Sequence, residues 1–208
     1  MKAHRPPDSR RQRGVAAVEA ALLLPLLMLL LFGMVDAARA LQANIIMTNI
    51  GREGANLVSR GNTDLETGSQ DILFALMSSA PPLDVGNQGM VYITRVMGVV
   101  TNNVSRNVVL DQYRWDDAGR ALGFRKSGYK PVSKVYNCGS WSSTSGKCTA
   151  FTSSNRPGVT LMAGKLDDGE VVYVVETFYR YDMLFSGFAS SALSLPDFGP
   201  DLYSFTVF

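Results

Sequence analysis

The apolar run from Val15 to Val35 constrains this chain more than any other feature of its sequence. It contains 21 residues and a single charged side chain, Glu19. At about 1.5 Å per residue, a helix of this length crosses the roughly 30 Å hydrocarbon core of a bilayer. The sequence therefore predicts one transmembrane helix over residues 15–35.

Basic residues before this run predict its orientation. Residues 1–14 carry five Lys or Arg side chains and one acid, Asp8, and such an excess keeps a flanking segment in the cytoplasm. The remaining residues hold 15 basic and 17 acidic side chains. We expect a basic cytoplasmic leader (1–14), a single pass through a membrane and an exported carboxyl-terminal part. Nucleic acid is not an expected partner, because phosphate contacts need clustered positive charge.

Glu19 is the candidate functional residue of the apolar run. An ionised side chain costs about 2.5–3.5 kcal/mol at the bilayer centre, so such residues are usually functional. In a lone subunit Glu19 can reach the nearby headgroups. In an assembly it can pair with a positive group of a neighbouring subunit, where a low dielectric strengthens the attraction. The alternative is that Glu19 lies at headgroup level without a role.

Pro25 interrupts the hydrogen bonding of the predicted helix. It has no amide hydrogen, so we expect a kink or a flexible point. Two interpretations stay open, a point that lets the helix pack in an assembly and a harmless kink.

The segment Arg13–Leu27 reads RGVAAVEAALLLPLL and continues to Gly33, Asp36 and Arg39. Its glycine, glutamate and proline stand at fixed offsets in an apolar segment. Over residues 10–52 the chain resembles the TadE-like minor pilins, or pseudopilins, of the tight-adherence (Flp) pilus system.

This resemblance implies a structural and not an enzymatic role. It implies a location in the bacterial inner membrane with the carboxyl-terminal part in the periplasm. It also implies that a membrane-embedded prepilin peptidase cuts between Gly14 and Val15, and that the chain associates with other pilins and with pilus assembly platform proteins. Cleavage would place the new ammonium of Val15 close to Glu19, which with Pro25 would set packing and register between subunits. Ala20 stands where processed members usually carry tyrosine, so a cleaved pilin and an uncleaved signal anchor are both compatible with the resemblance.

Two other functions stay open. One is an uncleaved, membrane-anchored envelope binding module that is not incorporated in a pilus. The other is a secreted hydrolase, because Ala38-Arg39-Ala40 has the small-x-small form of a signal peptidase site. The long apolar run and its flanking charges argue against the second.

Residue patterns after the apolar run predict an α+β fold, with a long amino-terminal helix packed on an antiparallel sheet. Apolar residues recur at helical spacing to about residue 58, although Gly51 and Gly54 weaken the pattern. A second helix is expected over 64–79, beginning at a Thr63-x-x-Glu66 capping box and ending before Pro81-Pro82. We expect an exported α+β domain over 59–208.

Strands are expected from residue 90 onward. The predicted strands are Met90–Thr101, Asn107–Trp115, Val171–Phe185 and Leu202–Phe208, with residues 102–106 as a hairpin loop. In the third, Glu176, Arg180 and Asp182 alternate with apolar residues, which predicts one buried and one solvated face. Asp168-Gly169 before it is typical of a hairpin turn.

Cys138 and Cys148 are the only cysteines. In an oxidising periplasm we expect them to form a disulfide across their Gly/Ser-rich loop. Trp141 in this loop is a candidate for exposed recognition, but packing against the sheet is the favoured prediction. Two cysteines without a nearby histidine do not predict a zinc site.

The sequence offers no catalytic group of the usual kinds. The only histidine is His4, in the leader, so the exported part lacks Ser/His/Asp and Cys/His systems. Asp116-Asp117 and the acids of 167–170 are interpreted as solvated turns. We expect no catalytic residues, no metal site and no cofactor.

Overall fold

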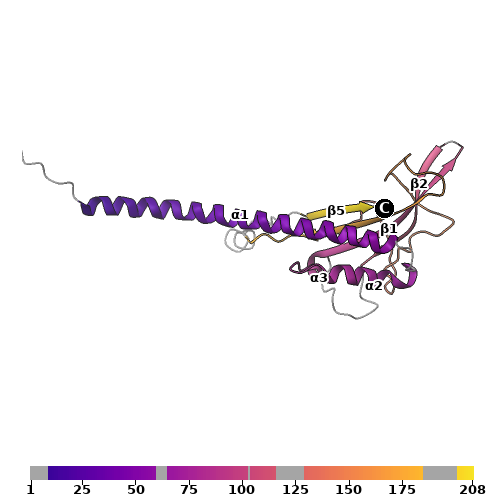
Figure 1. The fold of residues 1–208 in the computed structure, drawn as a ribbon, viewed down its shortest axis with the longest axis horizontal. Helices are drawn as coiled ribbons and strands as arrows, with labels where there is room; N and C mark the ends of the chain where they lie inside the picture. The colour runs from indigo at the N-terminus through magenta and orange to yellow at the C-terminus, as the bar shows by residue number, and fades with distance from the viewer. Residues whose placement is uncertain (1–8, 60–64, 103, 116–128, 185–200) are drawn as a thin grey trace, which may run out of the picture. The chain divides into compact units, whose positions relative to one another are not determined.

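The computed structural model describes residues 9–59, 65–102, 104–115, 129–184 and 201–208. It has three helices in these ranges, α1 (Ser9–Ser59), α2 (Leu65–Ser78) and α3 (Val85–Gln88). Its strands are β1 (Gly89–Thr101), β2 (Val104–Arg114), β3 (Gly158–Val159), β4 (Val171–Arg180) and β5 (Asp201–Val207) (Figure 1). The predicted α+β class is confirmed.

Two compact units divide the chain. One comprises Met1–Leu41 with Asp182–Phe198, and the other comprises Gln42–Tyr181 with Gly199–Phe208. The division predicted from the sequence, at residues 14, 35 and 58, stays a prediction.

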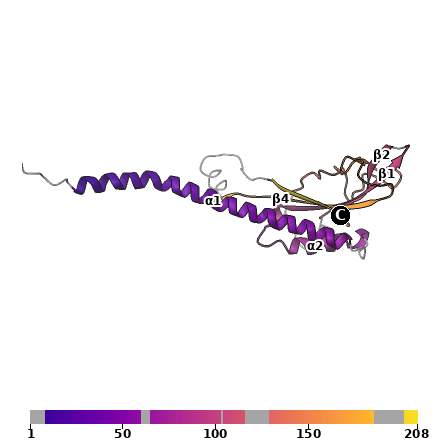
Figure 2. The same ribbon diagram turned by 45° about the horizontal axis from the view of Figure 1, so that its top comes forward.

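Helix α1 is longer than predicted. It begins at Ser9, six residues before Val15, and continues through Gly51 and Gly54 to Ser59. The helix continues through both glycines. Their missing side chains let other segments pack closely against α1. A Cβ atom at Gly54 would lie 2.8 Å from Cδ1 of Leu76, and one at Gly51 would lie 3.1 Å from Oγ1 of Thr206. Figure 2 shows α2 beside the carboxyl-terminal part of α1.

Helix α2 confirms the second predicted helix within one residue at each end. Its buried apolar side chains recur at helical spacing and face the core: Ile72, Leu73, Leu76 and Met77. Thr63 of the predicted capping box lies outside the described residues.

The five strands form one curled antiparallel sheet in the order β3-β2-β1-β4-β5. Strands β1 and β2 pair as far as Thr101 opposite Val104. The prediction of a loop over 102–106 is therefore wrong, since residues 104–106 belong to β2. Asn102 has a φ of 51°, a conformation that asparagine tolerates in tight hairpin turns.

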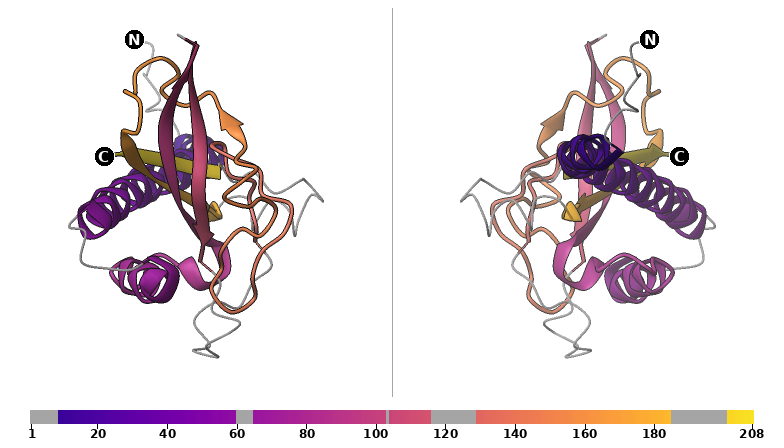
Figure 3. Two further views of the ribbon diagram at one scale, coloured as in Figure 1. Left: turned by 90° about the vertical axis from the view of Figure 1, so that its right-hand side faces the viewer. Right: turned by 90° about the vertical axis from the view of Figure 1, so that its left-hand side faces the viewer.

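Helices cover one face of this sheet. The side chain of Thr177 donates a hydrogen bond to the Met47 carbonyl oxygen at 3.3 Å, and Val175 lies against the backbone of Gly54. Because side chains alternate along a strand, the odd-numbered residues of β4 face α1 and α2. Figure 3 shows α2 and the second half of α1 on one side of the sheet.

Irregular chain covers much of the opposite face. Apolar side chains there form a second cluster: Val96, Leu166, Val172 and Val174. Residues 133 and 134 contact Glu176 on the same face. The prediction of a solvated face on this strand is therefore wrong, because β4 is a central strand with both faces covered. The strand also ends at Arg180, five residues before the predicted end at Phe185, which lies outside the described residues.

Asp168 and Gly169 form a turn but not the predicted hairpin. The preceding strand β3 pairs with β2, and β4 pairs with β1 and β5. The chain instead turns back on β1. The amide of Gly169 donates to the Gly98 carbonyl oxygen at 2.9 Å, and the amide of Val100 donates to the Asp168 carboxylate at 2.8 Å. Gly169 has a φ of +80°, which favours glycine.

Candidate functional site

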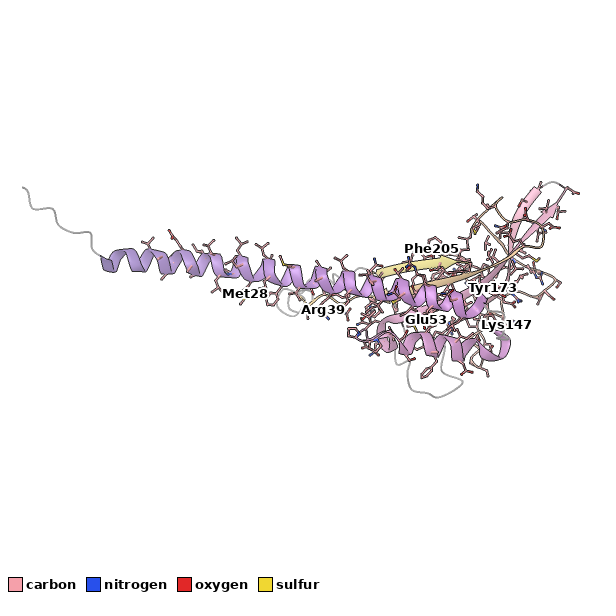
Figure 4. All side chains as sticks on the ribbon, in the orientation of Figure 1. Met28, Arg39, Glu53, Lys147, Tyr173 and Phe205 are labelled. Atoms are coloured by element: carbon pink, nitrogen blue, oxygen red, sulfur yellow. A yellow bond between two sulfur atoms is a disulfide. The ribbon has the colours of Figure 1, made fainter. Side chains whose placement is uncertain are left out.

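The amino-terminal part of α1 presents apolar side chains in every direction. Large apolar residues from Val15 to Met34 are exposed, and ten of them stand at positions 22–24 and 26–32. The most apolar stretch has a mean hydropathy of 2.5, and none of it is buried. Figure 4 shows side chains projecting around this stretch, with Met28 labelled. A helix that is apolar all round suits lipid or a protein core, and α1 is long and apolar enough to cross a membrane.

Gly14 and Val15, the predicted processing residues, lie inside α1. Proteases bind extended backbone, so the helix would have to unwind there before a cut. Glycine lowers the cost of unwinding by about 1 kcal/mol relative to alanine. The residue type at the predicted cut therefore favours local opening of the helix.

Glu19 lies on the exposed surface of α1, one helical turn after Val15. Among the residues that the structure describes, its carboxylate has no hydrogen-bond or ion-pair partner. Pro25 also lies inside α1, and the helix continues on both sides of it. The roles of Glu19 and Pro25 in subunit packing and register stay predictions.

Asp36 is a site residue whose surroundings the sequence did not predict. It follows the apolar run directly, and only 4% of its surface is exposed. Its Oδ1 atom accepts a hydrogen bond from the amide of Leu184 at 2.9 Å and lies 3.8 Å from Nη1 of Arg39. The position of this carboxylate directly after an apolar run could have marked Asp36 as a site residue. Its partner Leu184 could not be predicted, because it is 148 residues away in sequence.

An exposed apolar helix joined to an antiparallel sheet defines the class of this protein, an α+β chain with one helix able to cross a membrane. Residues 14–56 match the family model described as TadE-like protein, which confirms the resemblance predicted from the sequence. A TadE-like segment indicates a protein associated with the tight-adherence (Tad) pilus machinery. No curated protein and no solved structure matches the chain.

The disulfide loop lies on β2. Cys138 and Cys148 are at disulfide-bonding distance, with their Cα atoms 6.0 Å apart. The amide of Cys148 donates to the Gln112 carbonyl oxygen at 2.8 Å, which attaches the loop to the strand. Trp141 packs as the sequence favoured. Its ring centroid lies 5.7 Å from that of Tyr92 and 4.9 Å from Cζ of Arg114.

Glu176 was predicted to lie on a solvated face of its strand, but the structure buries it. Its surface is 0% exposed. One carboxylate oxygen accepts a hydrogen bond from the Ser133 hydroxyl, and the other accepts from the Lys134 amide at 2.9 Å and from the Tyr203 hydroxyl at 3.1 Å. Burial raises the pKa of Glu176, although these hydrogen bonds act in the opposite direction. Burial and the nearby Glu176 carboxylate also raise the pKa of Tyr203.

A buried amide extends this polar cluster. Nε2 of Gln112 lies 2.9 Å from Oγ of Ser133, 3.1 Å from Oγ1 of Thr94 and 3.0 Å from the Tyr136 carbonyl oxygen. The cluster joins β1, β2 and β4 to residues 133–136. Buried and hydrogen-bonded within the protein, it serves to hold irregular chain on the sheet. Within the described ranges, no group of three or more His, Cys, Asp or Glu side chains could hold a metal ion.

Proposed function

We propose that this chain is a minor pilin or pseudopilin that takes part in assembly of a tight-adherence (Flp-type) pilus. In this role it crosses the bacterial inner membrane once, with its amino terminus in the cytoplasm and its sheet in the periplasm. The observation that carries the proposal is that the TadE-like match, residues 14–56, coincides with the exposed apolar helix. The role is structural and not catalytic.

The exposed surface of α1 supports assembly through this helix. In a free subunit, lipid surrounds the apolar side chains of residues 15–35. In a pilus, the same side chains pack against helices of neighbouring subunits, and the sheet-bearing unit stays outside the helix bundle. One helix surface thereby serves both states without refolding.

Glu19 gives this packing its register. A prepilin peptidase cuts after Gly14 and leaves a positive ammonium group on Val15. The Glu19 carboxylate pairs with the Val15 ammonium of a neighbouring subunit. In a low-dielectric helix bundle an unpaired carboxylate is strongly unfavourable, so only the register that pairs it is stable.

The test is the Glu19→Ala variant in the host cell. We expect an unchanged amount of protein in the membrane and a reduced number of pili, because the apolar helix is intact and the register contact is lost. Immunoblotting of membranes and electron microscopy of cells measure the two quantities. Glu53→Ala is the matched control, since Glu53 is an exposed acid on the same helix beyond the apolar run.

Normal pili in the Glu19→Ala strain would rule out this role. That result would favour an anchored binding module, in which the helix is only a tether. If Glu19→Ala removes the protein from the membrane, Glu19→Gln provides a neutral side chain of similar size and repeats the test.

A further inference from the structure

Residues 182–184 run alongside α1 where the apolar run ends, and we call them the strap. The strap and this part of α1 belong to the same compact unit. The amide of Leu184 donates a hydrogen bond of 2.9 Å to the buried carboxylate of Asp36. Asp36 is the first residue after the 15–35 run, so the strap is attached at the predicted membrane boundary.

Met183 of the strap reaches further along the helix. It lines a pocket together with residues of α1 on both sides of Asp36: Leu29, Gly33, Asp36, Ala37 and Ala40. Leu29 lies seven positions before Asp36, which corresponds to about 10 Å along a helix. Leu29 and Gly33 belong to the run that is apolar enough to cross a bilayer. Met183 therefore lies beside helix turns that are at hydrocarbon depth whenever α1 spans the membrane.

From this geometry we propose that the strap is a second membrane contact of the protein. Met183 and Leu184 enter the apolar region of the bilayer beside α1, and Asp36 holds them there. The partner is the lipid bilayer itself. This inference goes beyond the proposed pilus role and requires only that α1 crosses a membrane.

Asp36 removes part of the cost of this placement. A backbone amide without a partner costs several kcal/mol in an apolar medium. The Asp36 carboxylate accepts the Leu184 amide, and the nearby Arg39 guanidinium offsets its charge. The Arg39 side chain is 46% exposed, and a long basic side chain at this level can reach lipid headgroups.

The exposed surface of the strap matches lipid better than water. Half of the Leu184 surface is exposed, and so is half of the surface of Leu29, which lines the pocket with Met183. The strap therefore continues the lipid-facing surface of α1. Burying this apolar area in the acyl region is favourable in proportion to the area removed from water.

A quenching experiment on the full chain tests the proposal. Leu184→Cys is labelled with an environment-sensitive fluorophore, and the protein is reconstituted in phosphatidylcholine vesicles. Cys138 and Cys148 are joined to each other and do not take the label without a reductant. The same label at Leu30→Cys reports the span, and at Val132→Cys it reports an exposed site of the sheet-bearing unit.

We expect lipid-attached nitroxide to quench the Leu184 label as it quenches the Leu30 label, and iodide in the buffer to quench only the Val132 label. In the background of Asp36→Ala, lipid quenching at Leu184 falls to the level of Val132. Asp36→Asn keeps an oxygen acceptor for the Leu184 amide, so it retains the quenching.

Two results would overturn the proposal. One is quenching of the Leu184 label by iodide as at Val132, and the other is protection from both quenchers, which would indicate a protein partner on the strap. Lipid quenching that persists in Asp36→Ala would overturn the role of Asp36. Pilus formation does not enter these measurements, so failure here is separate from failure of the proposed function.

Discussion

The Glu176 carboxylate holds three separate parts of the chain together. It accepts hydrogen bonds from Ser133 and Lys134 of an irregular segment and from Tyr203 of the last strand. Lys134 also places its ammonium group 3.8 Å from the centre of the Tyr203 ring. The contribution of this single side chain to stability is therefore large for a residue outside the apolar core.

Glu176→Ala should destabilise the protein. The substitution leaves buried donors without acceptors, and we expect the free energy of unfolding to fall by about 2–4 kcal/mol. Urea unfolding of the full chain in detergent micelles, followed by tryptophan fluorescence, measures this change. Glu53→Ala should leave stability nearly unchanged, and equal stability of the two variants would contradict the role of Glu176.

The pH dependence of this contribution has a definite sign. Burial raises the pKa of Glu176 above its ordinary value of 4.5, so the folded protein binds the proton more tightly than the unfolded chain. Its contribution is therefore greatest below pH 4.5 and declines as the pH rises through the folded-state pKa. Glu176→Gln mimics the protonated group and removes this dependence. A stability difference between wild type and Glu176→Gln that stays constant from acid to neutral pH would contradict the expectation.

At the scale of the elements, glycines mark where backbone segments approach closely. Gly98 in β1 lies against residues 166 and 167 of the segment that returns toward β4. A Cβ atom there would meet the backbone oxygen of Asp167 and would lie 2.8 Å from Cβ of Leu166. These neighbours are backbone or close to it, so they cannot rotate away.

Gly98→Ala should therefore be destabilising although alanine is the smallest chiral residue. We expect a loss of about 1–3 kcal/mol, typical of overpacking. Thermal or urea unfolding of the full chain measures it. Gly139→Ala is the matched control, because nothing lies within 4 Å of a Cβ atom at that position. A Gly98→Ala variant as stable as this control would contradict the packing seen here.

At the scale of the whole molecule, the leader accounts for the net positive charge of the chain. Residues 1–14 hold a quarter of the 20 basic residues, and without them the chain is slightly acidic. Processing after Gly14 would therefore change the charge of the protein as well as its length. It would also create the ammonium group on which the proposed pairing with Glu19 depends.

Mass spectrometry of the protein extracted from membranes tests this processing. We expect Val15 as the first residue in the wild type and a retained leader in Gly14→Leu, because a side chain at the cut hinders close backbone approach. Gly33→Ala should be processed normally, since it changes a glycine of the same helix with open space around it. A wild-type chain that begins before Gly14 would indicate an uncleaved anchor, and one that begins at Leu41 would indicate a secreted protein.

Local pattern carried most of the predicted fold. The apolar run, the helix over 65–78 and the strands β1, β2, β4 and β5 each follow from spacing along the chain, and the predicted bounds of this helix and these strands agree with the structure to within five residues. The strand β3 was not predicted, because its two residues are too short to give a pattern. The errors fell where distant segments decide the outcome. Gly51 and Gly54 were interpreted as weak helix positions, because the sequence does not reveal that Thr206 and Leu76 pack against them. The loop was predicted too long, because the sequence around Asn102 does not reveal that strand pairing resumes at Val104.

The sequence by itself determined that one helix is apolar enough to cross a membrane and that its start is TadE-like, because length, charge and fixed offsets are local properties. Only the tertiary structure decided that Glu176 is buried and that Asp36 holds residue 184. Burial depends on which segments cover a strand or a helix face. Those covering segments, residues 133–134 for Glu176 and residues 182–184 for Asp36, lie 42 and 148 residues away along the chain.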